Sequence, residues 1–248
     1  MIYKTKGIVL KNVKYGETSL VVTMFTELFG VQTYIVNGVR TQKKTGSKAA
    51  LFQPSSILEM EVYHNDQKAI HRIKEYNWNY LFKNVLSDVV KNSIAMFMIE
   101  LLQKTLKQPE QNIDLFYFCE DALQQLDDAP PAIAANFPLF FSLQLTQFFG
   151  FRFANPENAL DTEQDIFLDL QEGVFTAERP SHNYFIEKEE ALITAELLKI
   201  MQPHELNQVK LNHHKRRELL LKYMDYYTLH IQDFGQVRTL QVLHEVLG

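Results

Sequence analysis

The sequence predicts an α+β protein, with a small five-stranded β-barrel followed by an α-helical domain. In the first 80 residues, apolar and polar side chains alternate in short runs, whereas from Phe82 onward apolar residues recur every three to four positions. The charge changes near the same point. Residues 1–75 hold 11 Lys and Arg against 6 Asp and Glu, and residues 76–248 hold 14 against 24. Such asymmetry directs attention to a charged partner of the basic part.

Five runs rich in β-branched and aromatic residues predict the strands: Ile8–Leu10, Leu20–Phe25, Val31–Val36, Ser56–Tyr63 and Ala69–Ile73. Turn residues separate the first three runs at 15–17, 29–30 and 37–38. Alternation of this kind gives one buried and one solvated face. Five strands with short turns and one longer basic loop are typical of an OB-fold barrel, and a half-barrel or SH3-like sheet is the competing interpretation.

Helical periodicity then predicts a domain over residues 81–248, after a barrel domain over residues 1–80. The expected helices are 82–106, 113–126, 131–149, 187–201, 216–231 and 239–247. Residues 150–185 are polar and irregular, with a possible hairpin at 166–168 and 173–175. Trp78 is expected to anchor the junction between barrel and helices.

Composition limits the class of protein further. The single cysteine, Cys119, excludes an internal disulfide and a thiolate-rich zinc site, and we expect it to be a packed thiol. The N-terminus lacks the apolar core of a signal peptide. The longest apolar candidate for a membrane span, Ile94–Leu102, is interrupted by Glu100. A soluble, cytoplasmic protein is expected.

The loop Arg40–Lys48 carries the strongest chemical signal in the sequence. It places Arg40, Lys43, Lys44 and Lys48 within nine residues without an acid. Cationic side chains on a flexible loop can follow a phosphate backbone, while neighbouring hydroxyl and amide groups fix the register. A solubilising surface loop is the plainer interpretation.

Residues near this loop extend the predicted nucleic-acid surface. Lys11 and Lys14 lie in or just after the first strand. Tyr15 or Tyr34 could stack on bases, although aromatic residues at strand positions usually belong to the core. DNA binding through the barrel is therefore the leading functional hypothesis.

A second basic cluster opens the penultimate helix: Lys210, His213, His214, Lys215, Arg216, Arg217 and Lys222. Cations at a helix N-terminus oppose the helix dipole, so another role could favour them. A second DNA contact and a receptor for an acidic protein tail are both candidates, and a solvated helix face is the alternative.

An enzyme is the weakest hypothesis. The sequence contains no metalloprotease, hydrolase-elbow or nucleotide-binding glycine motif. His64 and His71 lack evident acidic partners, and the pairs Asp127–Asp128 and Glu189–Glu190 have the pattern of solvated surface charge. We expect neither a catalytic residue nor a cofactor.

Several motifs resemble one family. They are Gly7–Leu10 in the first strand, the turn Tyr15–Ser19, Thr26–Gly30, Gly38–Arg40 before the basic loop, and Ser56–Asp66. The run Leu219–Gly248 resembles the same family's last two helices. Together they are similar to the bacterial recombination-mediator family RecO, over nearly the whole chain.

The resemblance implies an OB-fold followed by a helical domain that binds and anneals single- and double-stranded DNA without catalysis. It also implies partnership with RecR and single-strand-binding protein in loading RecA during gap repair. Many members carry a four-cysteine zinc site, but residues 150–185 here contain no cysteine. We therefore predict no bound zinc, and a hairpin around Phe167–Phe175 that replaces the zinc-bound lobe by ordinary packing.

Overall fold

The computed structural model describes residues 1–40, 48–108, 110–155 and 166–247. Within it the chain forms two compact units, which are described separately below. The first contains Met1–Leu86 and Leu102–Asp127, and the second contains Ser87–Leu101 and Asp128–Gly248. One boundary falls inside helix α1 (Val89–Thr105), and another falls near the end of α2 (Ile113–Asp128).

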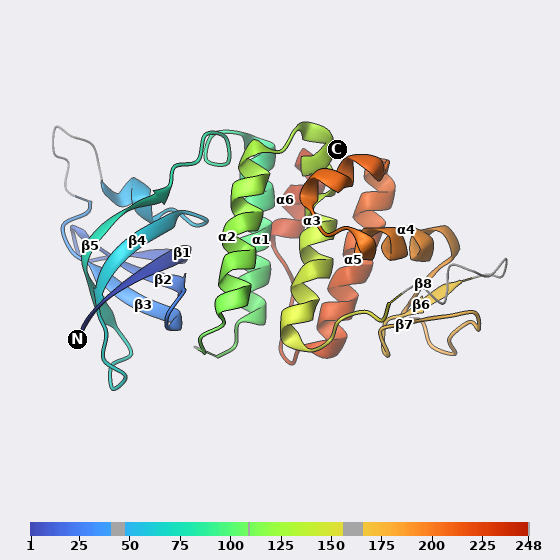
Figure 1. The fold of residues 1–248 in the computed structure, drawn as a ribbon, viewed down its shortest axis with the longest axis horizontal. Helices are drawn as coiled ribbons and strands as arrows, with labels where there is room; N and C mark the ends of the chain where they lie inside the picture. Colours follow the sequence, from blue (N-terminus) through green and yellow to red (C-terminus); the bar gives the residue numbers. More distant parts are fainter. Residues whose placement is uncertain (41–47, 109, 156–165, 248) are drawn as a thin grey trace. The chain divides into compact units, whose positions relative to one another are not determined.

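Five strands form a closed barrel in the first unit (Figure 1). They are β1 (Ile2–Tyr15), β2 (Ser19–Thr26), β3 (Gly30–Val36), β4 (Ile57–Tyr63) and β5 (His71–Tyr80). The order β1-β2-β3-β5-β4 closes where β1 pairs with β4, and only β3 and β5 run parallel. This is the five-stranded OB-type arrangement. The predicted barrel is confirmed, and the half-barrel alternative is wrong.

Alternation along the strands fills the barrel. Its buried cluster draws inward-facing residues from β1 to β4 and from the β3–β4 connection: Val9, Leu20, Val22, Met24, Tyr34, Val36, Val39, Phe52, Leu58, Met60 and Val62. A bulge between Val9 and Lys11 lets the 14-residue β1 bend, so that it pairs with β2 and β4. Trp78, in β5, packs against this cluster.

The outer face of the barrel is apolar where α2 covers it. Phe25 of β2 is fully buried, and its ring lies 5.6 Å from that of Phe116 in α2. Beside them, the Lys6 ammonium donates to both carboxylate oxygens of Glu120 at 3.0 and 2.9 Å. Ile8, Val9 and Leu10 of β1 are all buried as well, although strand side chains alternate between two faces.

Asp127, near the C-terminal end of α2, is fully buried, so its predicted place on the solvated surface is wrong. Its carboxylate accepts backbone N–H bonds from Lys83, Asn84 and Val85 at 2.7–2.8 Å. Burial raises the pKa of Asp127, but these bonds together outweigh it, and the pKa lies below its ordinary value. The sequence pattern missed the residue because adjacent acids usually mark exposed charge.

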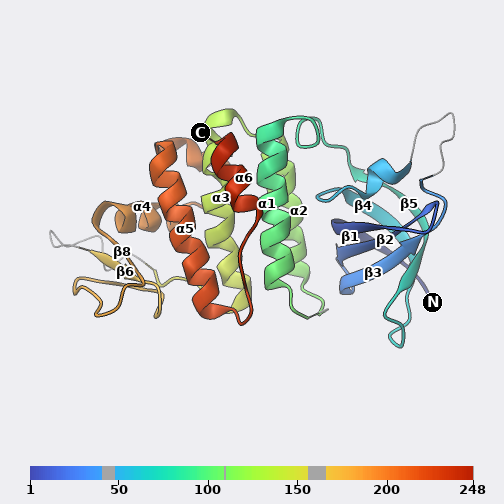
Figure 2. The same ribbon diagram turned by 180° about the vertical axis from the view of Figure 1, so that it is seen from behind.

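Helix α3 (Pro131–Leu145) is the centre of the second unit (Figure 2). It is buried on almost every side, and its continuation through η2 (Thr146–Phe149) makes a segment long and apolar enough to cross a membrane. However, 72% of that segment is buried within the protein, as in the core helix of a soluble protein. The unit therefore uses its most apolar segment as a core.

Further helices of the second unit follow α3 in the described part of the chain. They are α4 (Lys188–Lys199), η4 (Pro203–Gln208), α5 (His213–His230) and α6 (Thr239–Val246). Helix α5 begins three residues before the predicted start, because the Asn212 side chain caps it by accepting from the Lys215 N–H. Helix α6 begins where Glu100 accepts from the backbone N–H groups of Arg238 and Thr239.

A small sheet occupies the predicted irregular region. Its strands β6 (Phe167–Asp169) and β7 (Val174–Thr176) form the expected hairpin, and β8 (Phe185–Glu187) adds a third strand in the order β7-β6-β8. Aromatic side chains fasten this lobe to α5. The Phe153 ring stacks on Tyr226 at 3.9 Å, and His230 shares a hydrogen bond of 3.0 Å with the Leu170 carbonyl.

Candidate nucleic-acid interface

The base of the basic loop is tied to the β1–β2 turn. The Arg40 backbone N–H donates to the Thr18 carbonyl at 3.0 Å, and its guanidinium donates to the Gly16 carbonyl at 3.0 Å. The Ala49 N–H donates to the Val39 carbonyl at 3.1 Å and joins the two ends of the loop. Residues 41–47, with Lys43 and Lys44, lie outside the described residues. Their anchoring residues nevertheless bring the loop's base to Tyr15 and Gly16.

Lys11 and Lys14 lie on the part of β1 that leads into this turn. Lys11 pairs in register with Thr23 and Lys14 with Leu20, and both lysines are exposed. Neither lysine forms an ion pair within the described part of the chain. In contrast, Lys6 is paired with Glu120, and Lys4 and Lys74 both approach Glu61. Uncompensated positive charge therefore gathers at the turn end of β1.

The two tyrosines proposed for base stacking have different surroundings. Tyr15 is 58% exposed and stands beside Lys14. Tyr34 is fully buried in the barrel core, so it offers no stacking face, and the alternative that it belongs to the core holds. Lys48, the last basic residue of the loop, is exposed and places its ammonium 6.0 Å from the centre of the Tyr76 ring.

The β4–β5 connection contains features that the sequence pattern did not reveal. His64 stacks between Phe29 and His71, with ring centres 3.8 and 4.6 Å away, and shares a hydrogen bond of 2.8 Å with Asp66. The expectation that His64 lacks an acid partner is therefore wrong. Burial and the neighbouring His64 lower the pKa of His71. Arg72, exposed on β5 beside Ile35 of β3, adds a cation that the alternation of β5 could have indicated.

In the second basic cluster, some side chains already have partners within the protein, some line a cavity and others lie outside it. The Lys215 ammonium pairs with Glu189, and the Arg216 guanidinium donates to the Leu211 carbonyl. Arg216 and Arg217 line a cavity of about 70 Å³, together with His213. Lys210 is exposed and Lys222 is half-buried, and neither lines this cavity. The cluster is therefore not one continuous cationic surface.

The described residues gather no group of three or more His, Cys, Asp or Glu side chains with metal-binding geometry. Cys119 is buried in α2, as predicted, and burial raises the pKa of its thiol. A thiol with a raised pKa is a poor nucleophile and a poor metal ligand. With one buried cysteine in the chain, these residues do not fit a four-cysteine zinc centre.

The sequence matches two family models and several known proteins. Residues 1–82 match the family model for the N-terminal part of recombination protein O, and residues 86–237 match the model for its C-terminal part. The DNA repair protein RecO of Phocaeicola vulgatus is 33% identical over 100% of both chains. Those of Flavobacterium johnsoniae and Azobacteroides pseudotrichonymphae are 32% identical over 100% and 31% identical over 99% of both chains. The chain therefore belongs to the RecO family of DNA repair proteins.

Proposed function

We propose that this protein is a non-enzymatic recombination mediator that binds and anneals DNA strands through its barrel. In this role it acts with RecR and single-strand-binding protein to support RecA loading at DNA gaps. The observation that carries the DNA-binding part is the uncompensated positive charge of Lys11, Lys14 and Arg40 at the base of the basic loop. The partners follow from family membership alone.

Annealing in this proposal needs no catalytic group. Two DNA strands repel each other through their phosphates, and a basic surface that contacts both reduces that repulsion. Release of condensed counterions supplies the free energy of binding, so affinity falls as salt rises. The formal charge of −5 for the whole chain adds a repulsive background and makes the local basic surface decisive.

Replacement of Lys43 and Lys44 by Ala in the full chain tests the loop. We expect weaker binding to every DNA sequence. The slope of log affinity against log salt concentration should become shallower by about 2, because each lysine that contacts a phosphate contributes roughly one to this slope. K11A/K14A should act in the same direction. Fluorescence anisotropy with labelled single strands across salt concentrations measures both effects.

The matched control is K4A/K74A, which removes the same formal charge from lysines already paired with Glu61. We expect this control to change the slope by less than the loop variant does. Unchanged affinity of K43A/K44A at low salt would exclude the loop as a DNA-binding site. Equal effects of both double variants would mean that only the total charge of the protein matters for DNA binding.

A second role is favoured by the cavity at the start of α5. It has Arg216 and Arg217 at its edge and apolar residues of α3 and α6 as its floor. This combination suits an acidic peptide with an apolar end, and we propose that it docks the C-terminal tail of single-strand-binding protein. Lys215, already paired with Glu189, contributes less than the sequence cluster suggested.

Charge reversal at Arg217 tests this docking role. Because Arg217 is exposed, R217E should fold normally and bind an acidic, Phe-ended peptide at least tenfold more weakly, roughly the loss of one charge-assisted contact. R216Q should weaken binding too. K210E is the control, since Lys210 is exposed outside the cavity. If K210E weakens binding as much as R217E, docking in the cavity is refuted.

A further inference from the structure

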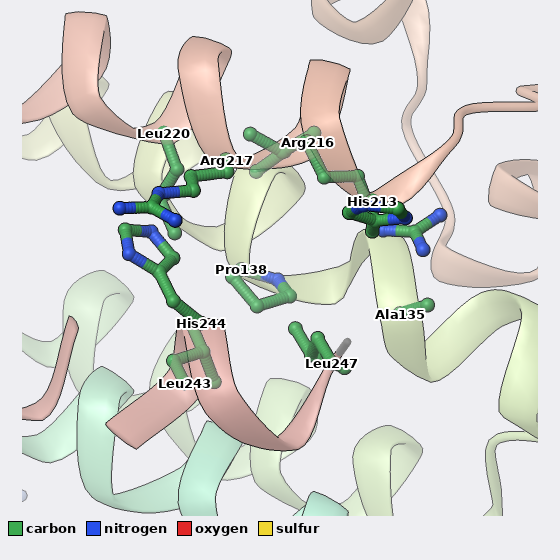
Figure 3. Close-up of a pocket in the computed structure, with 10 residues that line it drawn as sticks. Ala135, Pro138, His213, Arg216, Arg217, Leu220, Leu243, His244 and Leu247 are labelled. Carbon is green, nitrogen blue, oxygen red and sulfur yellow. The ribbon is translucent and has the colours of Figure 1, made fainter. Parts of the chain in front are cut away.

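The cavity proposed for tail docking is lined by a histidine, His244, that no sequence motif indicated. Figure 3 shows the His244 ring of α6 facing the guanidinium of Arg217 from α5, with Pro138, Leu243 and Leu247 around the same space. The His244 Nε2 atom is buried and has no hydrogen-bond partner. The Nε atom of Arg216, on the same cavity, is also buried without a partner.

Unsatisfied buried polar atoms are costly, so two of them around one small space indicate a missing polar group. A volume of about 70 Å³ is too small for a whole drug-sized molecule, but it can hold an end group. The cationic edge selects an anion, and the apolar floor selects one attached to an apolar side chain. A peptide's terminal carboxylate next to an apolar last residue fits both requirements, whereas a phosphate would leave the floor uncovered.

The charged groups around His244 are largely cationic. On α5 they are His213, Arg216 and Arg217, and α3 contributes only apolar side chains. Arg217 and His244 also line a larger neighbouring cavity, where Arg238 and Asp225 stand, and Glu245 follows His244 on α6. Asp225 has Lys222 close enough to lower its pKa, although burial raises it more.

We propose that a partner's terminal carboxylate binds between Arg217 and His244, and that His244 takes up a proton from solvent as the carboxylate enters. This inference rests on the docking role proposed above and adds its regulation. In the free protein, burial and the adjacent Arg217 lower the pKa of His244, so the ring is neutral near pH 7. An incoming carboxylate offsets the charge of Arg217 and accepts from the imidazolium, which raises the pKa.

The sign of the pH dependence follows from this shift. Because the bound form holds its proton more tightly than the free form, affinity rises as pH falls from the bound pKa to the free pKa, and it is constant outside that window. A shift of one unit corresponds to about a tenfold change in affinity. Because the free pKa lies below its ordinary value, only part of this window falls between pH 8 and pH 6, and we expect several-fold tighter binding at pH 6 than at pH 8.

The experiment titrates the full chain with a short aspartate-rich peptide that ends in Phe with a free carboxylate. Isothermal titration calorimetry at pH 6, 7 and 8, in buffers of different ionisation enthalpy, gives both affinity and proton uptake. H244Q should bind at pH 8 much like the wild type and lose the gain at pH 6. H204Q is the control, because His204 lies outside the cavity.

A readout without peptide separates the proton linkage from docking. R217Q should raise the His244 titration midpoint in NMR spectra of the free protein, because it removes the adjacent positive charge. Binding that does not vary with pH, or varies equally in H244Q, overturns the linkage and leaves docking standing. No binding at any pH overturns both. Equal binding of the C-terminally amidated peptide, or preference for a phosphate-ended oligonucleotide, overturns the assignment of the carboxylate.

Discussion

At the scale of single residues, Asp127 shows how a buried charge is stabilised by backbone donors. The N–H groups of residues 83–85 converge on its carboxylate, and the Asn84 side chain donates to its backbone carbonyl at 2.8 Å. The segment that follows β5 has no regular partner strand there, so its polar backbone groups need another acceptor. Asp127 supplies it and fixes the path of the chain after the barrel.

Asp127→Asn should therefore destabilise the protein by about 2 kcal/mol or more, because the amide presents N–H donors where the backbone already donates. D128N, at the exposed neighbouring position, should cost clearly less, because it removes no buried charge. Urea denaturation of both variants measures the difference. Similar midpoints for the two variants would contradict a structural role for the Asp127 carboxylate.

The same carboxylate gives stability a pH dependence. Since the folded pKa lies below its ordinary value, the stabilisation is present above the unfolded pKa, about 3.9, and is lost as pH falls through the folded pKa. D127N should therefore lose less stability on acidification than the wild type. Denaturation at a series of pH values between neutral and strongly acidic provides the measurement.

Residue identity alone could not separate buried from exposed polar groups. Tyr34 and Tyr15 both occur in β-rich segments, yet one is fully buried and the other is 58% exposed. Tyr34 is buried because it pairs with Val22 across β2 and β3 and so faces the barrel core. This pairing register depends on tertiary structure and cannot be read from the local sequence. Asp127 was missed for the same reason, since its donors lie more than 40 residues earlier.

At the scale of elements, the periodicity of apolar residues predicted those strands and helices that the local sequence determines. Alternation located the five strands, and β5 runs seven residues past its predicted end because His71–Tyr80 keeps alternating through polar residues. The small strand β8 was not predicted, since it is separated from β7 by a longer connection and no short turn marks it as part of the hairpin. Pairing decides such elements: Leu168 of β6 lies opposite Ile186 of β8.

The lobe formed by β6, β7 and β8 depends on close packing against α5. Gly173 has φ +69°, and a Cβ atom there would lie 2.6 Å from the Tyr226 hydroxyl oxygen. That hydroxyl donates to the Phe151 carbonyl at 2.6 Å, so it cannot move without losing a hydrogen bond. Both backbone and side-chain geometry therefore require glycine.

Gly173→Ala should cost about 2–4 kcal/mol, the sum of left-handed backbone strain and displacement of the Tyr226 hydroxyl. Gly150→Ala is the matched control, because Gly150 has φ +78° with open space around a built Cβ. The control should lose only the backbone share, roughly 1–2 kcal/mol. Hydrogen exchange in residues 166–187 should accelerate in G173A, and equal exchange in both variants would refute the packing argument.

At the scale of the whole molecule, the boundary between the two family models does not coincide with the boundary between the two compact units. The N-terminal family model ends at residue 82, yet residues 102–127 belong to the same compact unit as the barrel. The contacts that make this unit, Phe25 with Phe116 and Lys6 with Glu120, join residues about a hundred positions apart. No local pattern could have predicted them, and the expectation of one solvated face does not hold at Ile8–Leu10, where all three residues are buried.

A fragment of residues 1–82 should therefore be less stable than the same barrel in the full chain. Without α2, Phe25 loses its contact with Phe116, and a buried side chain of this size is worth about 1.5–3 kcal/mol. Trp78 is the only tryptophan and packs on the barrel core, so its fluorescence reports unfolding of the barrel in both proteins. The urea midpoint seen by Trp78 should be lower in the fragment.

Phe116→Ala in the full chain separates loss of this contact from truncation itself. It should destabilise the first unit by about 3–5 kcal/mol and lower the Trp78 midpoint in the same direction as the fragment. The fragment keeps the basic residues of the barrel, so its DNA affinity should retain the salt slope of the full chain wherever it is folded. An unchanged midpoint in F116A would mean that the barrel is stable without α2, and that the family boundary is also a folding boundary.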